Sequence, residues 1–293
     1  MKLSWLLNID RRIIYLLVIV ALGIPLFIDY SLAPAPMKTA NSFYKAIEKI
    51  APRGKIVLVA ADWGPGTQAE NEPQTAVAIE HLLRRRIPFA LISNIPFAKP
   101  YLEQLPETVA DRLEAETGEQ WDYGQDWVNL GYRPGGSIMI QGMAKAKDLH
   151  EVLKTDAEGT AISELPLMHN VRTIEDVAML VEVTGSVGVF NSWIQFFRND
   201  KYVPAMVHGC TAITIPEAYI YYVSKQIVGL FEGVAGAAWY EELLSENYPK
   251  REKGSALQMM TALSFAHLLI IALIVLGNIG NLAAFMKNRR KQP

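Results

Sequence analysis

Two long stretches without a charged residue bracket the chain, and they constrain its fold more than any other feature. The first covers residues 13–28 and the second residues 254–286. A helix needs about 20 apolar residues to cross the hydrocarbon core of a bilayer. Residues flanking the first stretch can extend it into the headgroup layer. We therefore expect one membrane-spanning helix over residues 13–30 and a second over residues 254–286.

The first stretch also has the outline of a secretory signal peptide. Arg11 and Arg12 precede the apolar core, and Ser31-Leu32-Ala33 follows it. Such a segment would be removed from the mature protein. Between these alternatives, we expect an uncleaved anchor.

Basic residues at the two ends predict the orientation. The amino tail, residues 1–12, has three basic residues, and the carboxyl tail, residues 287–293, has four. Cytoplasmic segments beside membrane spans are enriched in Lys and Arg. Six basic residues flank the spans on the side of the central domain, which reduces the difference in basic residues between the two sides of the membrane. We expect both tails in the cytoplasm, with residues 1–12 lying as a short helix in the membrane interface, and the domain between the spans outside.

Charge and cysteine content limit the function of the central part. The chain carries −2 and its tails +2 and +4, so the part between them carries −8. An acidic domain argues against nucleic acid as a partner. Cys210 is the single cysteine, which excludes an intramolecular disulfide and a cysteine-based zinc site. It follows His208 by two residues, but a buried apolar cysteine is the more common situation. The five histidines lack helical metal-ligand spacing, so we expect no metal site and no cofactor.

The central part alternates between apolar runs and amphipathic segments. After a linker and helix over residues 31–54, a domain over residues 55–253 follows. Strands that are apolar throughout are typical of a parallel sheet covered on both faces. We expect an α/β fold with an open, mostly parallel sheet, Rossmann-like or flavodoxin-like, flanked by helices. The expected strands are 55–62, 88–93, 126–132, 178–184 and 203–207, with a loop or short strand at 137–140. The expected helices are 38–50, 75–86, 100–117, 145–153, 190–198 and 222–247.

Ligands of such sheets bind outside the carboxyl ends of the strands, which directs attention to three loops. The first loop combines glycines with oxygen-bearing side chains: Asp62, Gly64, Gly66, Thr67, Glu70 and Asn71. Its carboxylates are suited to Mg²⁺ or Ca²⁺, but we favour a tight turn whose acids lie in the first helical turn. The second loop, Thr184-Gly185-Ser186, is suited to an anion or a sugar. It lacks the first glycine of a nucleophile elbow. The third contains Asp126 within an aromatic cluster that favours packing.

Small and polar residues mark one side of the second span. His267 lies within it, and Gly277, Gly280 and Ala284 follow. An ionisable group in a span is a candidate for function, here as a proton relay. Small residues, by contrast, let helices approach closely, and polar side chains bond across the interface. For a chain with two spans, we expect these residues to pack against another helix.

These observations favour a membrane-anchored extracytoplasmic α/β domain that acts as a self-associating scaffold or binding protein. Its expected partners are the lipid bilayer and further copies of itself, at a copy number that could be high, and any small-molecule ligand is unknown. The alternative is a membrane-tethered hydrolase or transferase that uses Asp62, Glu70 and Ser186 in a cleft at the strand ends. A solute-binding sensor is a third hypothesis, but the tails are too short to form an output domain.

Overall fold

The computed structural model describes residues 10–27 and 31–289. The chain divides into two compact units, one formed by Met1–Ala33 with Leu257–Pro293 and the other by Pro34–Ala256. Most of the expected interfacial segment, the end of the first expected span and the last residues of the basic tail lie outside the described residues.

The first unit contains two apolar helices, α1 (Arg11–Phe27) and most of α10 (Ser255–Arg289). Within the described residues, one helix is long and apolar enough to cross a membrane, over Ser255–Met286. Its side chains are widely exposed, including Leu268 at 60 % and Ile274 at 58 %. The 17 residues of α1 lie at the lower limit of the usual length of a span. The structure therefore shows one candidate span.

The second unit is built on a six-stranded sheet in which every neighbouring pair is parallel. The strand order is β3-β2-β1-β4-β5-β6, which is the order of the doubly wound Rossmann fold. The expected α/β class with a parallel sheet is confirmed. The strands are β1 (Ile56–Ala61), β2 (Phe89–Ser93), β3 (Trp127–Tyr132), β4 (Val177–Thr184), β5 (Ala205–Cys210) and β6 (Gly229–Glu232).

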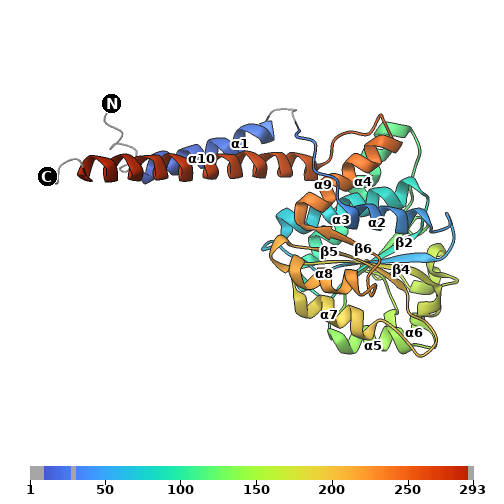
Figure 1. Ribbon diagram of the computed structural model, residues 1–293. Helices are drawn as coiled ribbons and strands as arrows, with labels where there is room; N and C mark the ends of the chain where they lie inside the picture. The colour runs from blue at the N-terminus through green and yellow to red at the C-terminus, as the bar shows by residue number, and fades with distance from the viewer. Residues whose placement is uncertain (1–9, 28–30, 290–293) are drawn as a thin grey trace. The chain divides into compact units, whose positions relative to one another are not determined.

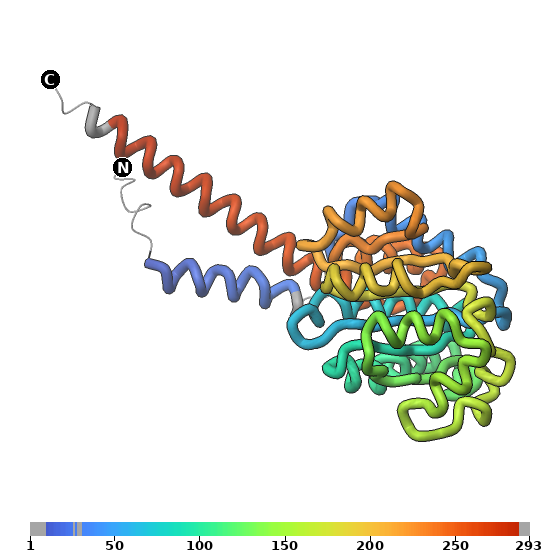
Figure 2. The backbone as a smooth tube through the Cα atoms, turned by 90° about the horizontal axis from the view of Figure 1, so that it is seen from below, coloured from blue at the N-terminus to red at the C-terminus, as the bar shows by residue number. Residues whose placement is uncertain are grey.

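Helices cover both faces of this sheet (Figure 1). One face carries α2 (Lys38–Glu48), α3 (Gln68–Arg84), α4 (Lys99–Thr117) and α9 (Gly233–Asn247). The other carries α5 (Ser137–Lys145), α6 (Leu149–Leu153), α7 (Val187–Phe196) and α8 (Ile215–Val223). Figure 2 looks onto this second face, where α5 and α7 lie side by side. With both faces buried, continuous apolar strands are the stable solution.

Three sequence expectations for the elements are wrong. Residues 137–140 begin the helix α5 instead of forming a loop or short strand, and α3 begins at Gln68 instead of residue 75. The expected helix over 222–247 is instead the end of α8, the strand β6 and α9. Tertiary packing decides the last case. A Cβ on Gly229 would lie 2.3 Å from the Phe43 Cα, so the first residue of β6 must be glycine for α2 to pack there.

A buried ion-pair network fastens the end of this unit to its helical layer. The Glu80 carboxylate on α3 is fully buried and lies 2.7 Å from Arg251 Nε and 2.7 Å from Arg112 Nη2. Arg84 Nε is the third basic group of the network and lies 2.9 Å from Glu80 Oε1. Burial by itself raises the pKa of Glu80, but Arg251 first, with Arg112 and Arg84, holds that pKa below its usual value. Arg251 lies in the segment between α9 and α10, so the network secures the point where α10 begins.

Candidate functional site

The carboxyl ends of β1, β4 and β5 bring three loops together. The Asp62 amide, just after β1, donates to the Val183 carbonyl at 2.9 Å. The Thr184 hydroxyl at the end of β4 donates to the Asp62 carbonyl at 2.7 Å, and Thr184 is in register with Cys210 of β5. The first two loops identified from the sequence are therefore neighbours at one edge of the sheet.

The Asp62 carboxylate is held entirely from within the protein. It is buried and accepts hydrogen bonds from Ser93 Oγ at 2.9 Å, the Asn94 amide at 2.5 Å and Trp193 Nε1 at 2.5 Å. Burial raises the pKa of Asp62, and the donors, Asn94 first, counteract that rise. Through these three bonds Asp62 joins the β2 loop to α7.

The other acid and amide of the first loop also bind protein groups. Glu70 Oε2 accepts the Ala212 amide at 2.8 Å, and Asn71 Nδ2 donates to Gln74 Oε1 at 2.9 Å. Gln74 Nε2 in turn donates to the carbonyls of Cys210 at 2.8 Å and Gly233 at 2.9 Å. These bonds fasten α3 to the loops after β5 and β6. Within the described residues, no group of three or more His, Cys, Asp or Glu side chains is arranged to hold a metal ion.

The loops at the crevice in which this fold usually binds ligands approach one another closely. It lies between β1 and β4, where the strand order reverses. A Cβ on Gly185 would lie 2.7 Å from Thr67 Cγ2 and 3.0 Å from Thr211 Cγ2, so the three loops already touch there. A Cβ on Gly64 would lie 3.0 Å from the Phe97 Cβ, so Phe97 packs closely against Gly64. A Cβ on Gly66 would meet nothing within 4 Å.

Ser186 is exposed at the amino end of α7. Its amide donates to Thr184 Oγ1 at 3.1 Å, while its hydroxyl makes no hydrogen bond to a described residue. A serine nucleophile requires a base within hydrogen-bond reach. Ser186 therefore lacks the partner that hydrolysis would need in this conformation.

The sequence interpretation missed a buried acid and a buried imidazole, which lie two residues before this edge on β4 and β5. Glu182 of β4 is in register with His208 of β5, and its Oε2 lies 2.5 Å from His208 Nδ1. The contact is close, but the carboxylate oxygens lack hydrogen-bond geometry to the described groups. Burial first and the charge of Asp62 second raise the pKa of Glu182, and burial lowers the pKa of His208 to about 3. Both shifts favour the uncharged forms.

This pair is sealed from solvent. The Phe190 ring of α7 stacks on the His208 ring with 4.0 Å between their centroids. The space that the imidazole lines, beside Thr184 and Ser186, has no room for a water molecule. The signal available in the sequence was a single acid inside an otherwise apolar run, at Glu182.

Cys210 is a buried thiol at the end of β5. Its Sγ donates to the Phe231 carbonyl at 3.3 Å, and burial raises the pKa of the thiol to about 12. A nucleophilic cysteine needs a low pKa and access to solvent. Cys210 meets neither condition and serves as part of the core.

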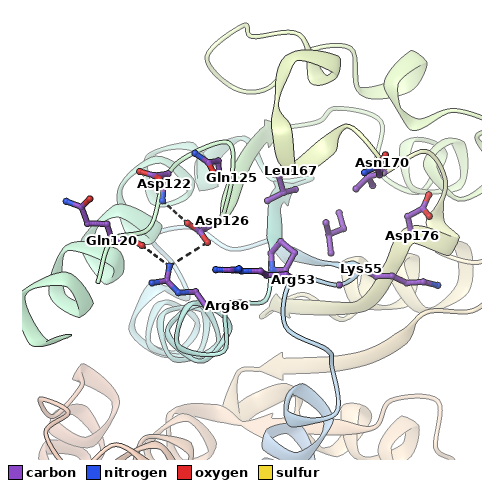
Figure 3. Close-up of a pocket in the computed structure, with 14 residues that line it drawn as sticks. Arg53, Lys55, Arg86, Gln120, Asp122, Gln125, Asp126, Leu167, Asn170 and Asp176 are labelled. Carbon is purple, nitrogen blue, oxygen red and sulfur yellow. Dashed lines mark hydrogen bonds and ion pairs between the residues drawn. The ribbon is translucent and has the colours of Figure 1, made fainter. Parts of the chain in front are cut away.

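Asp126 lies at the opposite edge of the sheet from the other candidates. It directly precedes β3, at the amino ends of the strands, so the rule for carboxyl ends does not apply to it. It lines an open pocket of about 840 Å³ (Figure 3). There its carboxylate accepts the Asp122 amide at 2.8 Å and lies 3.8 Å from Arg86 Nη1. Three acids and three bases balance the charge of this lining, which gives it no preference for one sign.

The four residues expected to pack in the second span all lie on α10. His267 is exposed, and a Cβ on Gly277 would meet nothing within 4 Å. Gly277, Gly280 and Ala284 recur at a spacing of three and four, so they share one side of the helix.

No protein-family model, curated protein or solved structure matches the chain. The strand order itself supports many unrelated functions and does not select one. The function must therefore be inferred from the surfaces and sites of this molecule.

Proposed function

We propose that the protein is a membrane-anchored α/β domain that associates with copies of itself and acts as a structural or binding component of a membrane assembly. The observation that carries this proposal is the character of the carboxyl edge of the sheet. The loops at its crevice meet at Thr67, Gly185 and Thr211, and its rim exposes apolar side chains. Such an edge is better suited to contact with another protein than to turnover of a small molecule.

Three side chains define this apolar rim. Phe97 is 69 % exposed after β2, Ile138 is 80 % exposed after β3, and Ile213 is 84 % exposed after β5. Because all six strands are parallel, the segments that follow them meet one edge of the sheet. A contiguous exposed apolar patch marks an interaction site, and we propose that these three side chains form part of one.

The second span supports the same proposal. The small residues Gly277, Gly280 and Ala284 permit another helix to come close; Gly280 is already buried within the single chain, whereas Gly277 has open space beside it. Close packing of small residues is a principal source of helix association in membranes. One or two spans cannot enclose a pore or a compartment, so any enclosure would require many copies.

The proposed topology has two spans, both tails in the cytoplasm and the α/β domain outside. Within the α/β unit, both chain ends leave beside α9. Asn41 of α2 accepts a hydrogen bond from Trp239 Nε1 at 2.9 Å, and the Ala256 amide donates to Glu241 Oε1 at 3.2 Å. Within the first unit, the Leu32 amide donates to Thr261 Oγ1 at 3.0 Å, so the segment after α1 and the early part of α10 lie side by side. This placement suits a pair of membrane anchors that enter from the same side.

Cysteine labelling tests the topology with little background, because Cys210 is buried. The unmodified protein should resist a membrane-impermeant maleimide, since a thiolate is scarce at a pKa of about 12. Gln141→Cys, at an exposed position of α5, should react in intact cells, whereas Asp10→Cys should react after permeabilisation. The reverse pattern would show that the domain faces the cytoplasm.

Self-association through the apolar rim is tested by a triple change, Phe97→Asp, Ile138→Asp and Ile213→Asp. We expect a smaller particle by mass photometry, because each contact would bury a charge instead of an apolar side chain. Val203→Asp is the matched control, since Val203 is 64 % exposed but precedes β5 at the opposite edge. An unchanged particle mass in the triple variant would remove the rim from the interface.

The enzyme hypothesis receives no support from the same residues. Asp62 and Glu70 both bind protein amides, and Ser186 lacks a base. An activity that survived in a rim variant and was lost with Ser186→Ala would restore that hypothesis.

A further inference from the structure

A groove of about 620 Å³ lies at the amino edge of the sheet, between the last turns of α2 and the starts of β4, β5 and β6. This volume falls within the range of pockets that hold small molecules. Its floor is apolar and is formed by Ala46, Ile50, Ala51, Ala178, Met179, Ala205 and Val228. The groove is separate from the carboxyl edge and from the apolar rim.

Lysines surround this floor, and no acid lines it. Lys45 and Lys49 are exposed, lie four residues apart at the end of α2, and make no ion pair with a described residue. Lys55 Nζ donates to the Glu175 carbonyl at 2.5 Å and lies 5.3 Å from the centre of the Tyr202 ring. Like charges at this spacing on a helix repel each other, so an anion between them would lower the free energy.

The acid closest in sequence does not neutralise these lysines. Glu48 Oε1 lies 2.8 Å from His81 Nε2 and 3.5 Å from Arg85 Nε, and it does not line the groove. The groove thus combines an apolar floor with a positive rim on which Lys45 and Lys49 have no acidic partner among the described residues, while Lys55 also lines the pocket around Asp126. This combination differs from the pocket around Asp126, where acids and bases balance.

We propose that the groove binds a single-chain amphiphilic anion, of the class of long-chain carboxylates. The carboxylate would lie among Lys45, Lys49 and Lys55, and the alkyl chain would cover the floor near Met179 and Ala205. A small inorganic anion would leave the floor exposed to water, and a cation would be repelled by the rim. This proposal does not depend on self-association of the protein.

Binding is tested with the full chain in phosphatidylcholine nanodiscs, by calorimetric titration with decanoate and subtraction of empty nanodiscs. We expect saturable binding that weakens about twofold to fourfold for each methylene removed, as for apolar groups that leave water. Decyltrimethylammonium should not bind at the same site. Phosphate binding as tight as decanoate binding would overturn the proposal. Displacement of bound decanoate when the nanodiscs contain an anionic two-chain lipid would overturn it as well.

Two variants assign the binding to this groove. Lys45→Gln with Lys49→Gln should weaken decanoate binding about tenfold or more, and Ala205→Trp should abolish it by filling the floor while the charges remain. The matched control is Lys147→Gln with Lys201→Gln, two exposed lysines elsewhere, which should leave the affinity unchanged. Equal affinity in the first variant and in this control would refute the site. The thermal unfolding midpoint of each variant reports its folding separately. If a variant has the parent's midpoint but no longer binds decanoate, the substitution has removed the binding site and not the fold.

Discussion

Replacement of Arg251 by alanine should lower the free energy of unfolding of the α/β unit by about 3–5 kcal/mol, because it leaves the buried Glu80 carboxylate with one fewer cation. Arg251 contributes two bonds to that carboxylate, from Nε at 2.7 Å and Nη2 at 2.8 Å. Its side chain is 1 % exposed, so water cannot replace the lost partner. Urea titration of the full chain in a neutral detergent, followed by tryptophan fluorescence, measures the change.

The matched control for this experiment is Arg172→Ala. Arg172 pairs with Asp148 at 2.8 Å, but its side chain is 50 % exposed. Exposed pairs contribute about 0–1 kcal/mol, so this variant should resemble the parent. If the two variants unfolded at the same urea concentration, the Glu80 network would not be the fastening that we infer at the start of α10.

Replacement of Gly229 by alanine should destabilise the fold by about 3 kcal/mol, since the new methyl group would overlap the backbone of α2. The Cβ would lie 2.3 Å from the Phe43 Cα and 2.6 Å from its nitrogen. A backbone cannot move aside as a flexible side chain can. The Phe43 ring is also stacked on Phe231 at 4.0 Å, so a displaced α2 would lose that contact. The same urea titration reports the loss.

Gly142→Ala provides the opposite expectation. Gly142 lies within α5 with nothing within 4 Å of its Cβ position, so alanine should stabilise the helix by about 0.5–1 kcal/mol. Equal effects of alanine at both glycines would show that helix propensity, and not the close approach of α2, governs Gly229.

The fold class was accessible from the sequence because its signal is local. The runs that became β1, β2, β3, β4 and β5 are mostly apolar, and this pattern is expected for a strand covered on both faces. The strand β6 was missed for two reasons. It has four residues, and its glycine is required by a contact with α2, which is distant in the sequence. Local patterns contain no information about such a contact.

The candidate site was accessible in part. Strand ends located Asp62, Thr184 and Gly185 together, because parallel strands share one carboxyl edge. Whether that edge is open could not be predicted, since the answer depends on two threonine methyl groups that meet at Gly185. The pairing of Glu182 with His208 depends on strand register, which the sequence also leaves open. Asp126 was assigned to the wrong edge because it precedes a strand instead of following one.

The central claim is that this chain works as an assembly of copies. The most direct measurement is the particle mass after chemical cross-linking in native membranes, followed by mass photometry of the extracted full chain. Our account predicts a discrete particle of several copies of the 32.7 kDa chain, with the same mass at two protein concentrations. A particle of one chain in its detergent micelle, with and without cross-linking, would contradict it.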